Sequence, residues 1–507
     1  MLPIVAVGHP AAQTAPVRIP RKKGDSLLFL VVPLVAVALY LPTLGFGLVF
    51  DDRSLIAPDG PVALGNGTLP YRPLRYLSLL LDHHLGGGHP GVYHATNVFL
   101  HAFACLLAVA IGRRLGLRPL VAALAVLMFA VHPLAVEVVA YVAGRRDLLA
   151  TACGLAALAL WTSNRGLTAP ALAMVLAGVA AKESALLYAP VLMAASLFGL
   201  GPAPSLGWRP LLWAMLAAIA LPVAYGARGP LVPDGGLAVV AVTSGRLAWH
   251  YAAGVVTPVG LSVEYPYLRC GSDCTELWGA PAAAGLVLLL VLALLGIAAV
   301  GAGRRAARAV DDSAQRPCSR PVLFTLVWTA LFALPLAVAI GAHEPGADRH
   351  AYPLLVPLAL LGACCVQWFF ERVEPGRLSM LASATAVTLL AVVLFALSLQ
   401  RTRVWRDERS LWTATVASTP RSARARVNLA AVLADEGSHR ESRRQLRRAL
   451  AIDERYAPAH VSLAWLACAD GRPHAASIHL ARARGAGADA GRLRAAEERC
   501  VSLPATP

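Results

Sequence analysis

Charged side chains are scarce in this sequence. They make up 15% of its 507 residues, whereas soluble globular chains carry about 25%, and 57% of the residues are hydrophobic. Apolar runs long enough to cross ~30 Å of hydrocarbon recur from Ser26 to about Ser398. The composition excludes a large soluble core. It predicts a membrane protein with a charged, soluble segment after Arg401.

Several sequence signals are absent. No A-x-A-like cleavage site follows the first apolar run, so we expect that run to remain as a span. No Gly-rich phosphate loop, HExxH helix or Ser–His–Asp order occurs, and the histidines do not fall at metal-ligand spacing. The net charge of +16 does not indicate nucleic-acid binding, because the cations lie in short loops and in the tail. A divalent cation stays open as a cofactor.

The apolar runs predict an all-α, polytopic membrane bundle of eleven spans. Lys and Arg collect in cytoplasmic loops, and "RKKGD" places the tail 1–25 in the cytosol. The opposite side then receives Asp51, Asp52 and the C-terminal segment. The expected spans are 26–46, 95–111, 119–135, 147–162, 167–181, 184–200, 210–226, 281–302, 320–341, 353–370 and 378–398, within a membrane domain of residues 26–398.

Two features leave alternatives open. The run 236–256 is interrupted by Arg246, Trp249 and His250, which favours an amphipathic helix lying in the outer interface; the alternative is a twelfth span. The stretch "CGSDC" holds Cys270 and Cys274, where a disulfide and two unpaired thiols are both possible.

The tail matches itself at an offset of 34 residues. Leu429 pairs with Leu463, Gly437 with Gly471, Leu446 with Leu480 and Ala449 with Ala483. A period of 34 with small residues at helix contacts is the tetratricopeptide signature. We therefore predict a helical-hairpin domain over 401–500 with about two repeats, and expect a helix within 401–420 to pack against the first repeat.

Two carboxylates, Asp51 and Asp52, come directly after the first span. They are either a solvated helix cap or a catalytic pair, because a partly desolvated carboxylate can have a raised pKa and act as a general base. The same outer side carries Glu137 and Arg145 in "HPLAVEVVAYVAGRRDLLA". Ionisable groups at membrane depth favour a functional interpretation.

Further charges lie on that side. Lys182 and Glu183 interrupt an apolar hairpin, either as a snorkelling ion pair or as a contact for an anionic headgroup. Arg349 and His350 stand at the mouth of the tenth expected span, where we expect them to meet a phosphate. His94, Asn97 and His101 share a helical face that we expect to pack against a neighbouring span.

The ordered motifs "FDDRSLI", "YRPLRYLSLLLD", "YHATNVFLH", "HPLAVEVVAYVAGRRDLLA", "AKES" and "DRHAYPLL", followed by the repeats, resemble the transmembrane and tetratricopeptide-repeat proteins. This family is a branch of the type-C glycosyltransferase superfamily that includes protein O-mannosyltransferases. The resemblance implies a polyprenyl-phosphate-linked sugar donor, with Asp51 or Asp52 as base and Glu137 as a second acid. It also implies that Arg145, Lys182, Glu183, Arg349 and His350 serve the donor phosphate or the architecture of the site.

Our leading hypothesis is transfer of a mannose-like sugar to a protein Ser/Thr or glycan hydroxyl on the outer face, with the repeats docking an acceptor protein. The rivals are a non-enzymatic scaffold and a transporter. A transporter is disfavoured because the charges gather at outer rims rather than mid-span. The Ala-, Leu- and Arg-rich composition favours a bacterial inner membrane, with the tail in the periplasm; in a eukaryote the site would be the endoplasmic reticulum.

Overall fold

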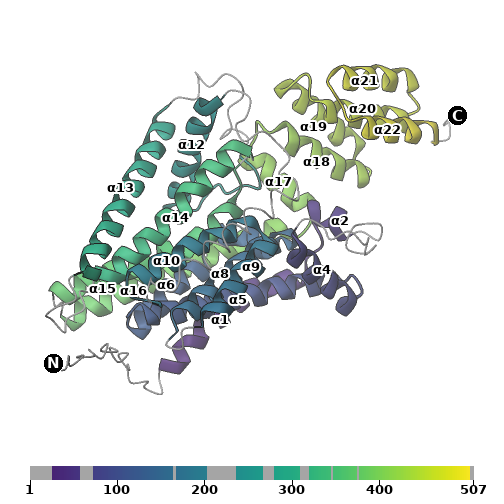
Figure 1. The fold of residues 1–507 in the computed structure, drawn as a ribbon. Coiled ribbons are helices and arrows are strands. Elements are labelled where there is room, and N and C mark those ends of the chain that lie inside the picture. Colours follow the sequence, from purple (N-terminus) through teal and green to yellow (C-terminus); the bar gives the residue numbers. More distant parts are fainter. Residues whose placement is uncertain are drawn as a thin grey trace, which may run out of the picture.

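The computed structural model describes residues 25–56, 72–163, 167–202, 236–265, 279–308, 319–343, 346–373 and 376–502. In these ranges all regular structure is helical apart from one isolated β-bridge, between Tyr265 and Gly346. The predicted all-α class is therefore confirmed. Figure 1 shows a bundle of long helices and, beyond one end of it, a stack of shorter helices that leads to the C-terminus.

The predicted spans coincide with helices wherever the structure describes them; the span expected at 210–226 and the pair Cys270 and Cys274 lie outside the described residues. The helices of the bundle are α1 (Asp25–Tyr40), α5 (Pro90–Arg114), α6 (Pro119–Ala130), α8 (Arg145–Trp161), α9 (Thr168–Ala181), α10 (Tyr188–Leu197), α12 (Gly236–Val256), α13 (Ala280–Arg308), α14 (Ser319–His343), α15 (Tyr352–Val373) and α16 (Arg377–Thr402).

Length and mean hydropathy qualify four of the described helices as membrane spans. These are Pro90–Arg114, Ala280–Gly303, Asp348–Val373 and Arg377–Trp405. A fifth candidate is a bent pair, Pro119–Ala130 and Pro133–Ala140, whose halves differ in direction by 55°. The remaining apolar helices are shorter. The helices fit a multi-pass membrane protein, and the number eleven stays a prediction.

The bend has a local cause. Pro133 has no N–H to donate, so the helix cannot continue through it. His132 caps the next turn, because its Nδ1 accepts from the backbone N–H of Leu134 at 3.2 Å. The chain then runs through the short helices η2 (Pro133–Ala135), α7 (Val136–Ala140) and η3 (Val142–Gly144). This break brings the polar stretch before α8 into the end of the bundle.

The helix over 236–256 packs against other helices of the bundle. α12 packs side by side with α13 and α14 (Figure 1). At Gly285 an added Cβ would stand 1.7 Å from the carbonyl oxygen of Gly245, so the two backbones touch. Small residues allow this close approach between membrane helices. The packing corresponds more closely to the alternative of a polar-lined helix within the bundle than to a helix lying in the interface.

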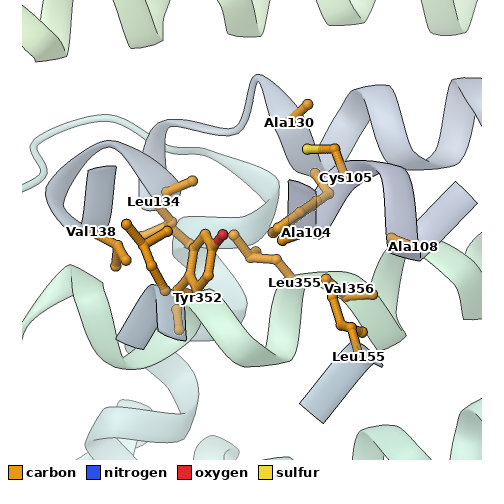
Figure 2. Close-up of a cluster of buried hydrophobic side chains, with 14 of the residues drawn as sticks. Ala104, Cys105, Ala108, Ala130, Leu134, Val138, Leu155, Tyr352, Leu355 and Val356 are labelled. Atoms are coloured by element: carbon orange, nitrogen blue, oxygen red, sulfur yellow. The ribbon is translucent and has the colours of Figure 1, made fainter. Parts of the chain in front are cut away.

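The bundle core is centred near Tyr352. Figure 2 shows its ring among Leu134, Val138 and Leu355, with Ala104 and Cys105 of α5 nearby. The Tyr352 hydroxyl is 2.9 Å from Nδ1 of His101. His94, Asn97 and His101 are all fully buried on one face of α5, as their spacing predicts. They contact polar atoms of neighbouring segments rather than lipid.

The tail forms two helical hairpins. α18 (Ala423–Asp435) pairs with α19 (His439–Ile452), and α20 (Ala457–Ala469) pairs with α21 (Pro473–Gly485), followed by α22 (Ala490–Ser502). Gly437 and Gly471, 34 residues apart, both take the left-handed conformation that closes the first helix of each hairpin. A disulfide between Cys468 and Cys500, which we did not predict, joins α20 to α22.

Candidate active site

The two adjacent aspartates point in different directions. They begin the short helix α2 (Asp51–Ile56), in which successive side chains are about 100° apart. Asp51 is exposed, whereas Asp52 is fully buried. Asp52 accepts hydrogen bonds from the backbone N–H groups of Val142 at 3.2 Å and Ala143 at 2.7 Å. Its oxygens are thus committed to holding η3, and Asp51 is the carboxylate that a substrate can reach.

Burial raises the pKa of Asp52 from 3.8 to about 7. The backbone hydrogen bonds from Ala143 and Val142 and the charge of Arg75 act in the opposite direction, but they only partly offset the burial. Asp52 therefore changes charge near neutral pH, directly beside the exposed Asp51.

Arg145 was expected to serve the donor phosphate or the architecture of the site. Its side chain is entirely buried and forms an ion pair with Asp82. It also donates to Asn97 Oδ1 at 2.9 Å, and to the carbonyl oxygens of Tyr93 at 2.6 Å and Ser78 at 3.2 Å. These contacts tie α4 (Pro73–Gly86), α5 and α8 together. These contacts fit the architectural alternative for Arg145.

Lys182 and Glu183 are likewise engaged in pairs across helices. Lys182 Nζ lies 2.6 Å from Oδ1 of Asp147, the third residue of α8. Glu183 lies 2.8 Å from Nη2 of Arg72, the residue before α4. The two adjacent residues therefore pin the turn between α9 and α10 to two other elements. Each of them thus has a partner of opposite charge on another element.

Glu137 and Arg349 form one unit. Glu137 is fully buried, and its Oε1 is 2.8 Å from Nη1 of Arg349. Its Oε2 accepts from the backbone N–H of Arg349 at 3.1 Å. Both oxygens are used, so Glu137 holds the segment η7 (Asp348–Ala351) in place. The neighbouring His350 is buried, with Nδ1 3.4 Å from the hydroxyl of Tyr251.

Three buried donors beside the aspartates have no hydrogen-bond partner in the part of the chain that the structure describes. They are Nε of Arg75, Nε of Arg146 and the hydroxyl of Tyr141. Nε of Arg146 does lie 3.5 Å from Oδ2 of Asp147, as an ion pair without a hydrogen bond. Burial, followed by the charges of Arg146 and Arg72, lowers the pKa of Arg75 to about 10. Crowded cations with unused donors, away from water, form a place that suits an anion.

Tyr141 stands at the centre of this group. Burial raises its pKa above the ordinary value, the charges of Asp52 and Asp51 raise it further, and those of Arg349 and Arg146 lower it. Asp51 and the cations are therefore within electrostatic reach of the same hydroxyl. Its ring lies between Phe50, at 5.9 Å, and Trp405, at 5.3 Å.

Sequence reasoning placed these charges at one end of the bundle, but it did not single out Arg75 and Arg146, and which arginines face a ligand stays a prediction. Arg75 and Arg146 lie inside the quoted motifs, next to residues that were singled out. The sequence does not show which of the neighbours Arg145 and Arg146 forms the buried ion pair with Asp82. Among the described residues no group of three or more His, Cys, Asp or Glu side chains could hold a metal ion.

Comparison with known proteins agrees with the motifs. The chain is 25% identical over 483 residues to a protein O-mannosyl-transferase of Caenorhabditis elegans, covering 87% of this chain and 65% of that protein. It is 37% identical over 141 residues to protein O-mannosyl-transferase Tmtc2 of Drosophila melanogaster, and 42% identical over 93 residues to human protein O-mannosyl-transferase TMTC4. These last two matches cover 24% and 16% of this chain, and 15% and 13% of the relatives.

The fold is that of a helical protein with several apolar helices that fit a multi-pass membrane protein, and with a helical-hairpin tail. Its homologues are protein O-mannosyl-transferases, as the ordered motifs predict. The chain spans less than two thirds of the length of these relatives. No protein-family model matches the sequence, and no solved structure matches it. These relatives are all animal proteins, so the expectation of a bacterial inner membrane rests on composition alone.

Proposed function

We propose that the protein is a membrane glycosyltransferase that moves a sugar from a polyprenyl-phosphate donor to the hydroxyl of a protein or glycan acceptor. The observation that carries the proposal is a set of three buried donors near the exposed Asp51, on Arg75, Arg146 and Tyr141, that make no hydrogen bond among the described residues. The names of the relatives favour mannose as the sugar and a protein as the acceptor.

The reaction needs two separate functions, and the site offers both. Asp51 takes the proton of the acceptor hydroxyl while its oxygen attacks the anomeric carbon of the sugar. The bond between that carbon and the phosphate oxygen breaks, and the electron pair leaves with the polyprenyl phosphate. Arg75 and Arg146 stabilise the charge that develops on this phosphate. Asp52 and Glu137 position the loops that hold these groups, and Lys182, Glu183, Arg349 and His350 complete the framework.

The lipid part of the donor has a suitable surface on the same helix as Arg75. Leu77, Leu81 and Leu85 are exposed on α4 and spaced by four residues, so they form one apolar stripe. A helix with a cation facing the site and leucines facing outward suits the boundary between headgroups and acyl chains. It would place a lipid-linked phosphate beside Arg75 with its chain in the bilayer.

Two observations support an outer face for this chemistry. The tail contacts the Asp51 turn, since Glu408 Oε1 is 2.7 Å from the backbone N of Phe50. The tail also carries the Cys468–Cys500 disulfide, and disulfides persist in oxidising compartments such as the periplasm or the lumen of the endoplasmic reticulum. Because the Asp51 turn and the tail contact each other, they lie on the same side of the membrane, and the disulfide favours a side other than the cytosol.

The test uses the full chain in nanodiscs with a radiolabelled polyprenyl-phosphate mannose and an acceptor peptide. Asp51→Asn should lower kcat by about 10²- to 10⁴-fold, the contribution of a general base, with the donor KM little changed. Asp435→Asn, at an exposed aspartate of α18, is the matched control and should turn over like the wild type. Wild-type kcat in Asp51→Asn would remove the base assignment, and a scaffold would show no turnover at all.

A further inference from the structure

The residue before the exposed aspartate has an unusual backbone. Phe50 has φ of +56°, in the left-handed region that residues with a Cβ rarely adopt. Such a conformation persists only where its surroundings impose it. The backbone N–H of Phe50 donates to Oε1 of Glu408 at 2.7 Å, across 358 positions of sequence. The support for this turn therefore comes from the far end of the chain.

Glu408 is the first residue of α17 (Glu408–Ser418), and it is itself held on both sides. Its Oε2 accepts from the indole Nε1 of Trp412 at 2.6 Å. The Trp412 ring in turn packs edge-on against Phe50, with ring centroids 5.3 Å apart. A second backbone contact, from the N–H of Gly47 to the carbonyl oxygen of Arg406 at 3.1 Å, joins the same two segments.

The position of α17 in the tail explains why it is available to contact the turn that carries Phe50. An ion pair between Arg409 and Glu436 at 2.5 Å recurs 34 residues later between Arg443 and Asp470, also at 2.5 Å. At this offset α17 corresponds to residues 442–452, which are all but the first three residues of α19, the second helix of a hairpin. The chain before α17 is α16 and the short helix η8 (Arg403–Trp405), so no first helix of the tail pairs with it. The turn carrying Phe50 packs against α17 instead.

We propose that Glu408 is a positioning residue and that α17 clamps the turn from which Asp51 projects. The tail is then part of the catalytic unit as well as a surface for an acceptor. This inference rests on the proposed function, in which Asp51 accepts the proton of the acceptor hydroxyl.

The clamp acts on the geometry of proton transfer and not on donor binding. Glu408→Ala leaves the N–H of Phe50 without its acceptor and frees the left-handed turn to relax, which moves Asp51. Misplacement of a reacting group by about 1 Å costs on the order of 100-fold in rate. We expect kcat to fall by about 10- to 100-fold with the donor KM unchanged. Glu408→Gln keeps an oxygen that can accept from Phe50, so it should restore kcat to within a few-fold of the wild type.

The matched control is Glu436→Ala. It removes the same kind of side chain from the same tail, at an ion pair that is largely exposed to solvent. Two measurements are made on each variant in nanodiscs: kcat and KM for the labelled donor, and hydrogen exchange of the backbone amides over 45–56. In Glu408→Ala the amides of Gly47 and Phe50 should exchange faster, whereas in Glu436→Ala they should match the wild type.

The outcomes separate this inference from the proposed function. If the wild type transfers sugar but Glu408→Ala keeps the wild-type kcat, or Glu408→Gln is as slow as Glu408→Ala, the clamp is refuted and the function stands. If the wild type transfers no sugar, the proposed function fails, and with it the positioning role for catalysis. Unchanged exchange over 45–56 in Glu408→Ala would refute the clamp whatever the activity.

Discussion

The buried Asp52 predicts an unusual dependence of stability on pH. Its pKa rises from 3.8 in the free residue to about 7 in the folded chain. Between these two values the folded protein binds a proton at Asp52 that the unfolded chain has released, so stability falls as the pH rises and the loss is complete above about 7. At about 1.4 kcal/mol per unit of pKa, a shift of about three units corresponds to about 4 kcal/mol, of which about 2.5 kcal/mol falls between pH 5 and 8.

The substitution that isolates this effect is Asp52→Asn. Asparagine never carries the charge, and like the protonated acid it offers one acceptor oxygen to the N–H groups of Val142 and Ala143. Wild type and variant should therefore be similar in stability near pH 5. Towards pH 8 the wild type should lose about 2.5 kcal/mol relative to Asp52→Asn.

The assay is equilibrium unfolding in mixed micelles, followed by tryptophan fluorescence at several values of pH, with the exposed Asp435→Asn as control. The difference between wild type and Asp52→Asn should grow with pH, while that between wild type and Asp435→Asn should stay constant. Parallel curves for wild type and Asp52→Asn would show that burial does not raise the pKa of Asp52.

Three further predictions follow from named contacts. Arg75→Met and Arg146→Met should each raise the donor KM by about tenfold, in line with the loss of a hydrogen bond to a charged group, whereas Arg440→Met on the exposed face of α19 should not. Replacing Cys468 and Cys500 by serine should destabilise the tail by about 3 to 4 kcal/mol, because the disulfide closes a loop of 32 positions. Calorimetry of the wild type with and without reductant should show the same loss of stability. Gly285→Ala should lower the thermal stability because its Cβ would meet the backbone of Gly245, whereas Gly362→Ala, with open space around it, should not.

The sequence predicts the helices of the bundle well, because an apolar run of membrane-spanning length can be recognised without knowing which other segments it contacts. It also predicts the hairpins of the tail, since Gly437 and Gly471 mark the same turn twice. It does not predict α17 as the contact for the Asp51 turn. That contact joins Phe50 to Glu408, and no local pattern connects residues so far apart.

For the candidate site, the sequence indicates a region of the chain but not which charged side chains pair with one another. Residue type and membrane side identify Arg145, Lys182 and Arg349 as candidates for a phosphate, but each is paired with a carboxylate on another element. Such pairing depends on how helices lie side by side. The same packing separates Asp51 from Asp52, which the sequence alone left open. It also leaves Nε of Arg75 and Nε of Arg146 without a hydrogen bond among the described residues.

The buried ion pairs and the buried donors without hydrogen bonds can be understood together. Removing two opposite charges from water is costly, and a buried ion pair often contributes little to stability. The three buried ion pairs are therefore better explained by the elements that they hold in place than by a gain in stability. They are Arg145 with Asp82, Lys182 with Asp147 and Arg349 with Glu137, and each holds one end of a helix. Nε of Arg75, Nε of Arg146 and the Tyr141 hydroxyl are within electrostatic reach of one another and make no hydrogen bond among the described residues. A buried donor without a hydrogen bond costs about 1 to 3 kcal/mol. The proposed function would offset this cost, because the phosphate of the sugar donor could accept from these groups.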